Sequence, residues 1–195
     1  MWPEAVIGLL LTGLAIRLVD DALDREEDEE AGVANLAGRL GGAAAAYAAA
    51  SLALAALLLP RHGPALFLAA YALGMAGSLT ERLPTRLPGW VETAAAAGLL
   101  FLLVPAGVAL WALLLMGAFQ AADWAMDGLM APGMGPARAA PAVATSRRAA
   151  AWGLLALGLT LLAASLAPAL TLAGAAAGAV LEAAVKGPGR RSGHA

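Results

Sequence analysis

Residues 89–128 read GWVETAAAAGLLFLLVPAGVALWALLLMGAFQAADWAMDG, and this stretch decides the fold. A helix that crosses a membrane needs about 20 mostly apolar residues, because lipid offers the backbone no hydrogen-bond partners. Two apolar runs approaching that length occur here. Pro105 and Gly107 lie between them and disfavour an unbroken helix. The stretch therefore predicts two membrane-spanning helices rather than one.

The rest of the chain repeats this pattern. Of its 195 residues, 61% are hydrophobic and 13% are charged, whereas about a quarter are charged in a typical soluble domain. We therefore expect an all-α protein with a single transmembrane domain over residues 1–195, built as a bundle of about seven helices. The predicted spans are 3–19, 40–59, 64–79, 89–104, 106–122, 149–166 and 169–185. A signal peptide would begin with a positively charged stretch, but no basic residue precedes Arg17. The first segment is therefore expected to be a retained span.

The distribution of Lys and Arg supports seven crossings and predicts their orientation. With seven spans, every basic residue except Arg61 falls on one side of the membrane, and joining residues 89–127 into one span would lose this separation. The positive-inside rule then places the N-terminus outside and the C-terminus in the cytoplasm. The Ala-, Gly-, Leu- and Arg-rich composition fits a prokaryotic cell membrane. The net charge of −2 predicts no nucleic-acid partner, and the absence of cysteine excludes disulfides and thiolate metal sites.

A first acidic cluster, DDALDREEDEE over residues 20–30, follows the first predicted span. If the helix continues, Asp20, Asp21, Asp24 and Asp28 lie along one of its sides, while all four glutamates fall outside this template. Carboxylates at a helix C-terminus face the negative end of the helix dipole and require a cation. Oxygen ligands of this kind favour Mg²⁺, which often shares them with phosphates. The alternative is a solvated acidic loop.

A second acidic pair ends the fifth predicted span, where Asp123 and Asp127 are spaced i, i+4 on one helical face. An even number of crossings separates this pair from the first cluster, so both sets lie on the cytoplasmic side and can face one another across a bundle. Glu92 and Glu182 lie within about a turn of span ends. Each of these glutamates either reaches the membrane interface or enters a polar cavity.

The two aspartate motifs resemble those of the UbiA-type intramembrane prenyltransferase superfamily. That family carries N/D-D-x-x-D-x-x-x-D at the end of its second helix and D-x-x-x-D at the end of its sixth, so predicted spans one to five would correspond to its helices two to six. Arg82, before Leu87-Pro88, matches part of the basic loop between the family's helices four and five. By this correspondence, the first and last of the family's usual nine helices are not expected within these 195 residues.

The resemblance implies that Mg²⁺ joins the two aspartate sets to the diphosphate of an isoprenyl donor, whose isoprenyl group is then transferred to an acceptor within the membrane. The implied metal-binding and catalytic residues are Asp20, Asp21, Asp24, Asp28, Asp123 and Asp127. Arg82, Arg39 and Arg86 would contact phosphate oxygens, although the positive-inside rule also explains each of these arginines. One alternative is a non-catalytic UbiA-like membrane protein with a structural or lipid-organising role. Another is a cation transporter, whose carboxylates would lie near the middle of the bilayer.

Overall fold

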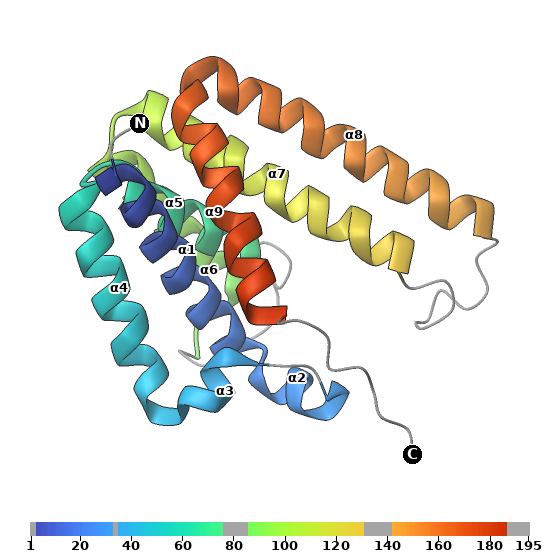
Figure 1. Ribbon diagram of the computed structural model, residues 1–195, viewed down its shortest axis with the longest axis horizontal. Helices are drawn as coiled ribbons and strands as arrows, with labels where there is room; N and C mark the ends of the chain where they lie inside the picture. Colours follow the sequence, from blue (N-terminus) through green and yellow to red (C-terminus); the bar gives the residue numbers. More distant parts are fainter. Residues whose placement is uncertain (1–2, 33–34, 76–85, 131–141, 187–195) are drawn as a thin grey trace.

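The computed structural model describes residues 3–32, 35–75, 86–130 and 142–186, and this part of the chain is helical without any strand (Figure 1). In chain order the helices are α1 (Pro3–Leu23), α2 (Arg25–Ala31), α3 (Leu36–Leu40), the 3₁₀ turn η1 (Gly41–Ala43), α4 (Ala44–Leu58), α5 (His62–Met75), α6 (Gly89–Leu103), α7 (Ala106–Met130), α8 (Ala142–Leu166) and α9 (Pro168–Lys186). The all-α prediction is confirmed, and each predicted span overlaps one long helix.

The predicted break at Pro105 is confirmed. Helix α6 ends at Leu103, and Val104 adopts an extended backbone (φ −131°, ψ 154°), which is the conformation favoured before proline. The carbonyl of Pro105 then accepts hydrogen bonds from the backbone N–H groups of Val108 (2.8 Å) and Ala109 (3.0 Å), which starts α7. The two apolar runs of residues 89–128 therefore form separate helices.

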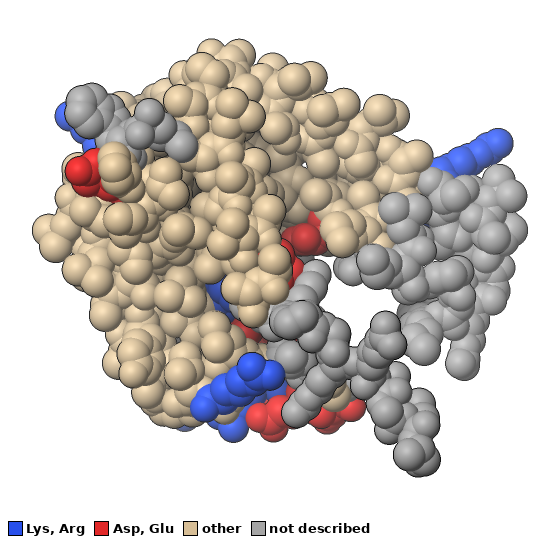
Figure 2. Space-filling view, viewed as in Figure 1, with Lys and Arg blue, Asp and Glu red and all other residues tan. Residues whose placement is uncertain are grey.

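Three described segments are long and apolar enough to cross a membrane: Leu36–Leu58, Ala106–Met126 and Arg147–Leu166. Only 22%, 33% and 11% of their residues, respectively, are buried inside the protein. Large apolar side chains consequently cover the outside, as at Leu57 and Leu102, each 79% exposed. Charged side chains on the face in Figure 2 are few and lie at its edges and in a central hollow. Such an apolar exterior is typical of a protein that contacts lipid.

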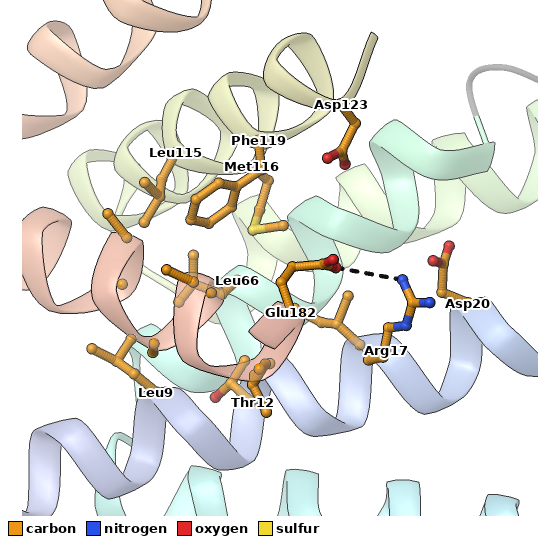
Figure 3. Close-up of a pocket in the computed structure, with 18 residues that line it drawn as sticks. Leu9, Thr12, Arg17, Asp20, Leu66, Leu115, Met116, Phe119, Asp123 and Glu182 are labelled. Atoms are coloured by element: carbon orange, nitrogen blue, oxygen red, sulfur yellow. Dashed lines mark ion pairs between the residues drawn. The ribbon is translucent and has the colours of Figure 1, made fainter. Parts of the chain in front are cut away.

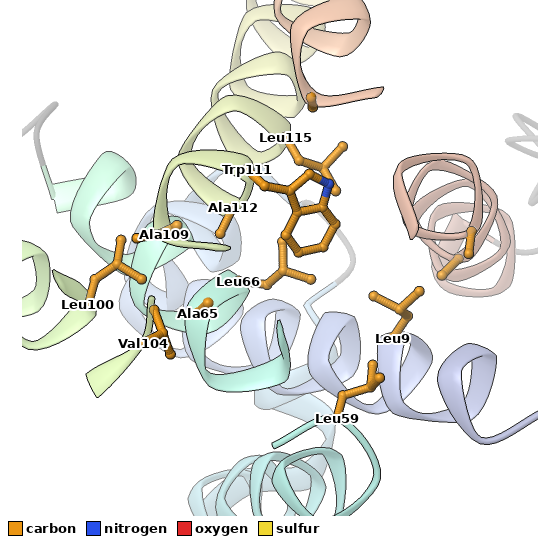
Figure 4. Packing of buried hydrophobic residues seen from close by; sticks show 14 of the residues in the cluster. Leu9, Leu59, Ala65, Leu66, Leu100, Val104, Ala109, Trp111, Ala112 and Leu115 are labelled. Atoms are coloured by element: carbon orange, nitrogen blue, oxygen red, sulfur yellow. The ribbon is translucent and has the colours of Figure 1, made fainter. Parts of the chain in front are cut away.

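Helix α1 packs against α4, α5 and α9, while α7 and α8 run side by side as a long pair and α7 also packs on α5 (Figure 1). The buried core includes Trp111 and Leu115 of α7, which meet Leu66 of α5 (Figure 4). Glycines allow the close approaches. A Cβ atom at Gly8 would lie 2.8 Å from Leu59, and one at Gly13 would lie 2.5 Å from Leu181. Small residues at helix contacts are the usual means of packing helices within lipid.

The helix expected to continue through residue 28 instead breaks after Leu23. Asp24 (φ −90°, ψ 8°) separates α1 from α2, although the hydrogen bond from Asp24 N to Asp20 O (3.0 Å) persists. Helix α2 leaves the axis of α1 (Figure 1) and ends at Gly32, whose left-handed conformation (φ 67°) suits glycine. The four aspartates of the first cluster therefore do not lie along one side of a continuous helix.

Candidate functional site

A pocket of about 360 Å³ lies between α1, α7 and α9 towards their C-terminal ends (Figure 3). Its polar end is formed by Arg17 and Asp20 of α1, Asp123 of α7 and Glu182 of α9. The rest of its wall is mainly apolar and includes Leu9, Ile16, Leu66, Leu115, Met116, Phe119 and Leu181. The pocket thus joins a charged end to an apolar body.

Asp20 and Asp123, one from each predicted motif, line this same pocket although they lie on different helices (Figure 3). Asp20 follows the last apolar residue of the first predicted span. Its side chain keeps an exposed surface, yet partial burial of the carboxyl group raises its pKa to about 6. Repulsion from Asp24 adds to this rise, the charge of Arg17 opposes it, and repulsion from Asp21 and Asp123 contributes further. Negative charge from both motifs therefore acts on a single carboxyl group.

Asp21 faces away from the pocket and ties α1 to α3. Its side chain is 2% exposed, and one carboxylate oxygen accepts a hydrogen bond from Leu36 N (2.6 Å). The other carboxylate oxygen lies 2.8 Å from Nε of Arg17. The backbone carbonyl of Asp21 also accepts a hydrogen bond from the side chain of Asn35 (2.5 Å). Asp21 is therefore committed to the connection between these helices, and it is absent from the pocket wall.

The remaining predicted aspartates have different positions. Asp24 is exposed at the bend after α1, close enough to Asp20 to raise that residue's pKa. Asp28 lies in α2 and accepts a hydrogen bond from Asn35 Nδ2 (2.8 Å). Asp127 lies one turn after Asp123 in α7, and its side chain is outside the described residues.

Among the described residues, Arg17 is the arginine that lines the pocket, and the sequence had indicated no role for it beyond the distribution of positive charge. Its Nη1 lies 3.6 Å from Glu182, while its Nε makes the buried contact with Asp21, which lines no part of the pocket. Of the arginines predicted to bind phosphate, Arg39 and Arg86 are exposed and line no part of this pocket, and Arg82 falls outside the described residues. The i, i+4 spacing of Arg17 and Asp21 was the available sequence signal.

Glu92 and Glu182, whose positions the sequence left undecided, lie in different environments. Glu182 enters the pocket, because Leu181 packs over Gly13 and places the next residue of α9 beside Arg17. Glu92 is 7% exposed and accepts a hydrogen bond from the hydroxyl of Tyr71. The structure therefore adds one carboxylate to the pocket that the sequence did not assign to it.

The donor atoms of the pocket are compatible with Mg²⁺, which prefers carboxylate oxygens and commonly takes further oxygens from a bound phosphate. Asp20 and Asp123 provide such oxygens. Within the described ranges, no group of three or more His, Cys, Asp or Glu side chains is gathered closely enough to hold a metal ion. Asp20 and Asp123 would supply two of the oxygens around such an ion.

No protein-family model matches the chain, and no curated protein or solved structure is detectably similar to it. A cavity with an apolar body and a charged end suits an amphiphile that has an apolar tail and a polar head. Its carboxylates suit a head that carries or recruits a cation, and Arg17 suits an anionic head. A diphosphate bound together with a divalent cation satisfies both requirements.

Proposed function

We propose that the protein is an Mg²⁺-dependent prenyltransferase, similar to UbiA-type enzymes, that moves an isoprenyl group from a diphosphate donor to an acceptor within the membrane. The observation that carries this proposal is that Asp20 and Asp123 line one pocket whose body is apolar. A diphosphate near these carboxylates would leave its isoprenyl tail beside residues such as Leu66, Leu115 and Phe119. The resemblance of the two aspartate motifs supplies the reaction class.

We further propose that the chain crosses a cell membrane seven times, with the pocket opening towards the cytoplasm. Helices α1, α7 and α9 would be the first, fifth and seventh crossings, which run in the same direction. Their C-terminal ends meet at the pocket, as this topology requires. A six-crossing chain, with α6 and α7 joined, would run α1 and α9 in opposite directions. The excess of Lys and Arg on the pocket side then gives the orientation.

In this proposal Asp20 and Asp123 hold the Mg²⁺–diphosphate group at the charged end of the pocket. Bound Mg²⁺ would neutralise the negative charge that develops on the leaving diphosphate. The bond between the allylic carbon and the diphosphate oxygen breaks, the carbon bonds to the acceptor, and the acceptor releases a proton. The apolar wall around Leu115 and Phe119 excludes water, so that the acceptor rather than water captures the isoprenyl group.

A second candidate is a non-catalytic membrane protein that binds a lipid in this pocket and has a structural role. Two observations favour it. Asp21, a member of the first motif, is occupied in joining α1 to α3, and Arg17 in the pocket is already paired with Glu182. This candidate predicts binding of an isoprenyl lipid without release of diphosphate.

Both candidates are tested by measuring diphosphate release from geranyl, farnesyl and geranylgeranyl diphosphate with Mg²⁺ and extracted membrane lipid. The purified full chain is compared with Asp20→Asn and Asp123→Asn, each expected to lose about 100-fold or more in turnover. Glu4→Gln is the matched control, because Glu4 is an exposed acid at the other end of α1. Wild-type turnover in both aspartate variants would contradict the site. No release from any donor would leave the non-catalytic candidate.

A further inference from the structure

Arg17 lies between two acids that hold it with very different strength. On one side, its Nε is 2.8 Å from Asp21, whose side chain is 2% exposed and is also fixed by Leu36 N. On the other side, its Nη1 is 3.6 Å from Glu182, whose side chain is 49% exposed. A long, half-exposed ion pair contributes little, because water screens it and the side chains lose freedom. The contact with Asp21 is a short, enclosed ion pair in which Arg17 Nε forms no hydrogen bond, whereas the contact with Glu182 is longer, open to water and easily exchanged.

The exchangeable side of Arg17 is the side that faces the pocket. Figure 3 shows Glu182 reaching towards Arg17, with Asp20 and Asp123 at the same end of the cavity. A guanidinium offers several N–H donors in one plane, and this arrangement matches phosphate oxygens better than a single carboxylate at 3.6 Å. Because the short ion pair with Asp21 already holds the guanidinium beside the pocket, less ordering remains to be done when an anion arrives.

We propose that Arg17 binds the anionic head group of the pocket's ligand, and that Glu182 occupies this position in the ligand-free chain and is displaced when the ligand binds. The proposal rests on the proposed function for the identity of that head group, a diphosphate on an isoprenyl chain. Glu182 then acts as an internal competitor. Its departure also removes one of three pocket carboxylates, the others being Asp20 and Asp123, from the neighbourhood of the incoming negative charge.

The position of Glu182 on α9 makes this exchange feasible. It lies in the last two turns of α9, which ends at Lys186, and Leu181 anchors that part of the helix over Gly13 of α1. Glu182 can therefore change its rotamer without lifting α9 from α1, because the apolar contact is made by its neighbour. A purely structural ion pair predicts the opposite behaviour, since its loss would loosen α9 and weaken ligand binding.

The test is a double-mutant cycle on the affinity for farnesyl diphosphate, measured with the full chain in dodecyl maltoside, which contributes no phosphate. We expect Glu182→Gln to bind about 2- to 5-fold more tightly, since this range corresponds to an exposed ion pair. We expect Arg17→Gln to bind about 10- to 100-fold more weakly, since charge-assisted hydrogen bonds are lost. In the Arg17→Gln background the Glu182→Gln change should have no further effect. Arg17→Lys should recover part of the affinity.

Measurements of the affinity in EDTA and in Mg²⁺ separate the contribution of Arg17 from that of a bound metal ion. The Arg17 and Glu182 effects should persist in EDTA, where the contribution of Asp20 and Asp123 is removed. The control is the exposed Arg25–Glu29 ion pair, which lies outside the pocket, so Arg25→Gln and Glu29→Gln should leave the affinity unchanged. Farnesol, which lacks the anionic group, should bind equally to all variants.

The possible results are distinct for the two proposals. Unchanged or weaker binding by Glu182→Gln, or equal tightening for farnesol, overturns the exchange at Arg17 even if the enzyme turns over. If the affinities follow the predicted double-mutant cycle but no diphosphate is released, the exchange at Arg17 is supported and the proposed transferase activity is overturned. If Arg17→Gln does not fold, Glu182→Gln decides alone, because its exposed side chain can be neutralised without disturbing the buried contact of Asp21.

Discussion

The last turn of α1 presents two faces with the same type of residue and different consequences. On the pocket face, Asp20 is exposed and shares the charged end of the cavity with Asp123 (Figure 3). On the opposite face, Asp21 is 2% exposed and is held by Leu36 N and Arg17. One step along a helix turns a side chain by about 100°, and here that rotation separates an acid available to a ligand from one used in folding.

The two carboxylates are expected to change the free energy of unfolding in opposite directions. Asp21 has a hydrogen-bond donor and a cation in contact, so removal of its carboxylate leaves Leu36 N without its acceptor and Arg17 without its nearest counter-charge. Asp20 is partly desolvated beside other acids, so its negative charge is destabilising at neutral pH. An acidic motif in the sequence therefore contains residues with structural roles and residues with ligand-binding roles, and stability measurements can sort them.

The largest effect is expected for Asp21→Ala. This change removes a buried carboxylate from Leu36 N and Arg17, and we expect the free energy of unfolding to fall by about 3 kcal/mol. Thermal or denaturant unfolding in detergent measures it, with Asp20→Ala as the matched comparison on the pocket face. If Asp21→Ala and Asp20→Ala were equally stable, the proposed difference between a structural acid and a pocket acid would be wrong.

A smaller loss, of about 1 to 2 kcal/mol, is expected for Asn35→Ala. The Asn35 side chain caps α3 by accepting from Gly38 N (2.6 Å), and its amide donates to the carbonyl of Asp21 and the carboxylate of Asp28. Asn35→Asp is an informative companion, since it keeps an acceptor for the cap but loses the donor and adds charge beside Asp28. If Asn35→Asp matches the wild type in unfolding experiments, the contacts to the acidic cluster contribute nothing.

A pH-dependent effect is expected on the pocket face. Because the pKa of Asp20 is raised to about 6 from its ordinary 3.8, the folded chain binds this proton more tightly than the unfolded chain. Proton binding by Asp20 therefore stabilises the folded chain. This stabilisation is complete below about pH 4 and is lost as the pH rises through 6. Asp20→Asn should therefore be more stable than wild type at pH 7, and the difference should shrink towards pH 4. Parallel unfolding curves across this range would contradict the raised pKa.

The smallest effect is expected beyond the bend, in α2. Arg25 and Glu29 form an i, i+4 ion pair at 2.8 Å, but their side chains are 51% and 59% exposed. We expect Arg25→Gln to leave the unfolding midpoint unchanged within error at any salt concentration, because water and ions screen an exposed pair. A clear shift of the midpoint would show that α2 supports the two faces of α1 more than its exposure indicates.

Much of the helical architecture was predictable from the sequence, because it depends on local properties. Apolar runs form helices wherever they occur in lipid, and the Val104-Pro105 pair ends one helix and begins the next regardless of its neighbours. The counting of crossings also placed the ends of the first and fifth spans on one side. Asp20 and Asp123 accordingly meet in one pocket.

The assignment of individual side chains was not predictable, because it depends on residues distant in the chain. The break at Asp24 and the capture of Asp21 by the Asn35–Leu36 turn divide a motif that a continuous helix would have kept on one side. Arg17 enters the site only because α9 brings Glu182 alongside it.

The sequence by itself determined that the chain is helical, that one helix ends and another begins at Pro105, and which helix ends carry the acids, since each follows from local composition and the bilayer's demand for internal backbone hydrogen bonds. Only the tertiary structure decided that Asp20 faces the pocket, that Asp21 does not, and that Glu182 contacts Arg17. The physical reason is that the partner of a charged side chain is selected by contacts between helices, and local periodicity does not specify those contacts.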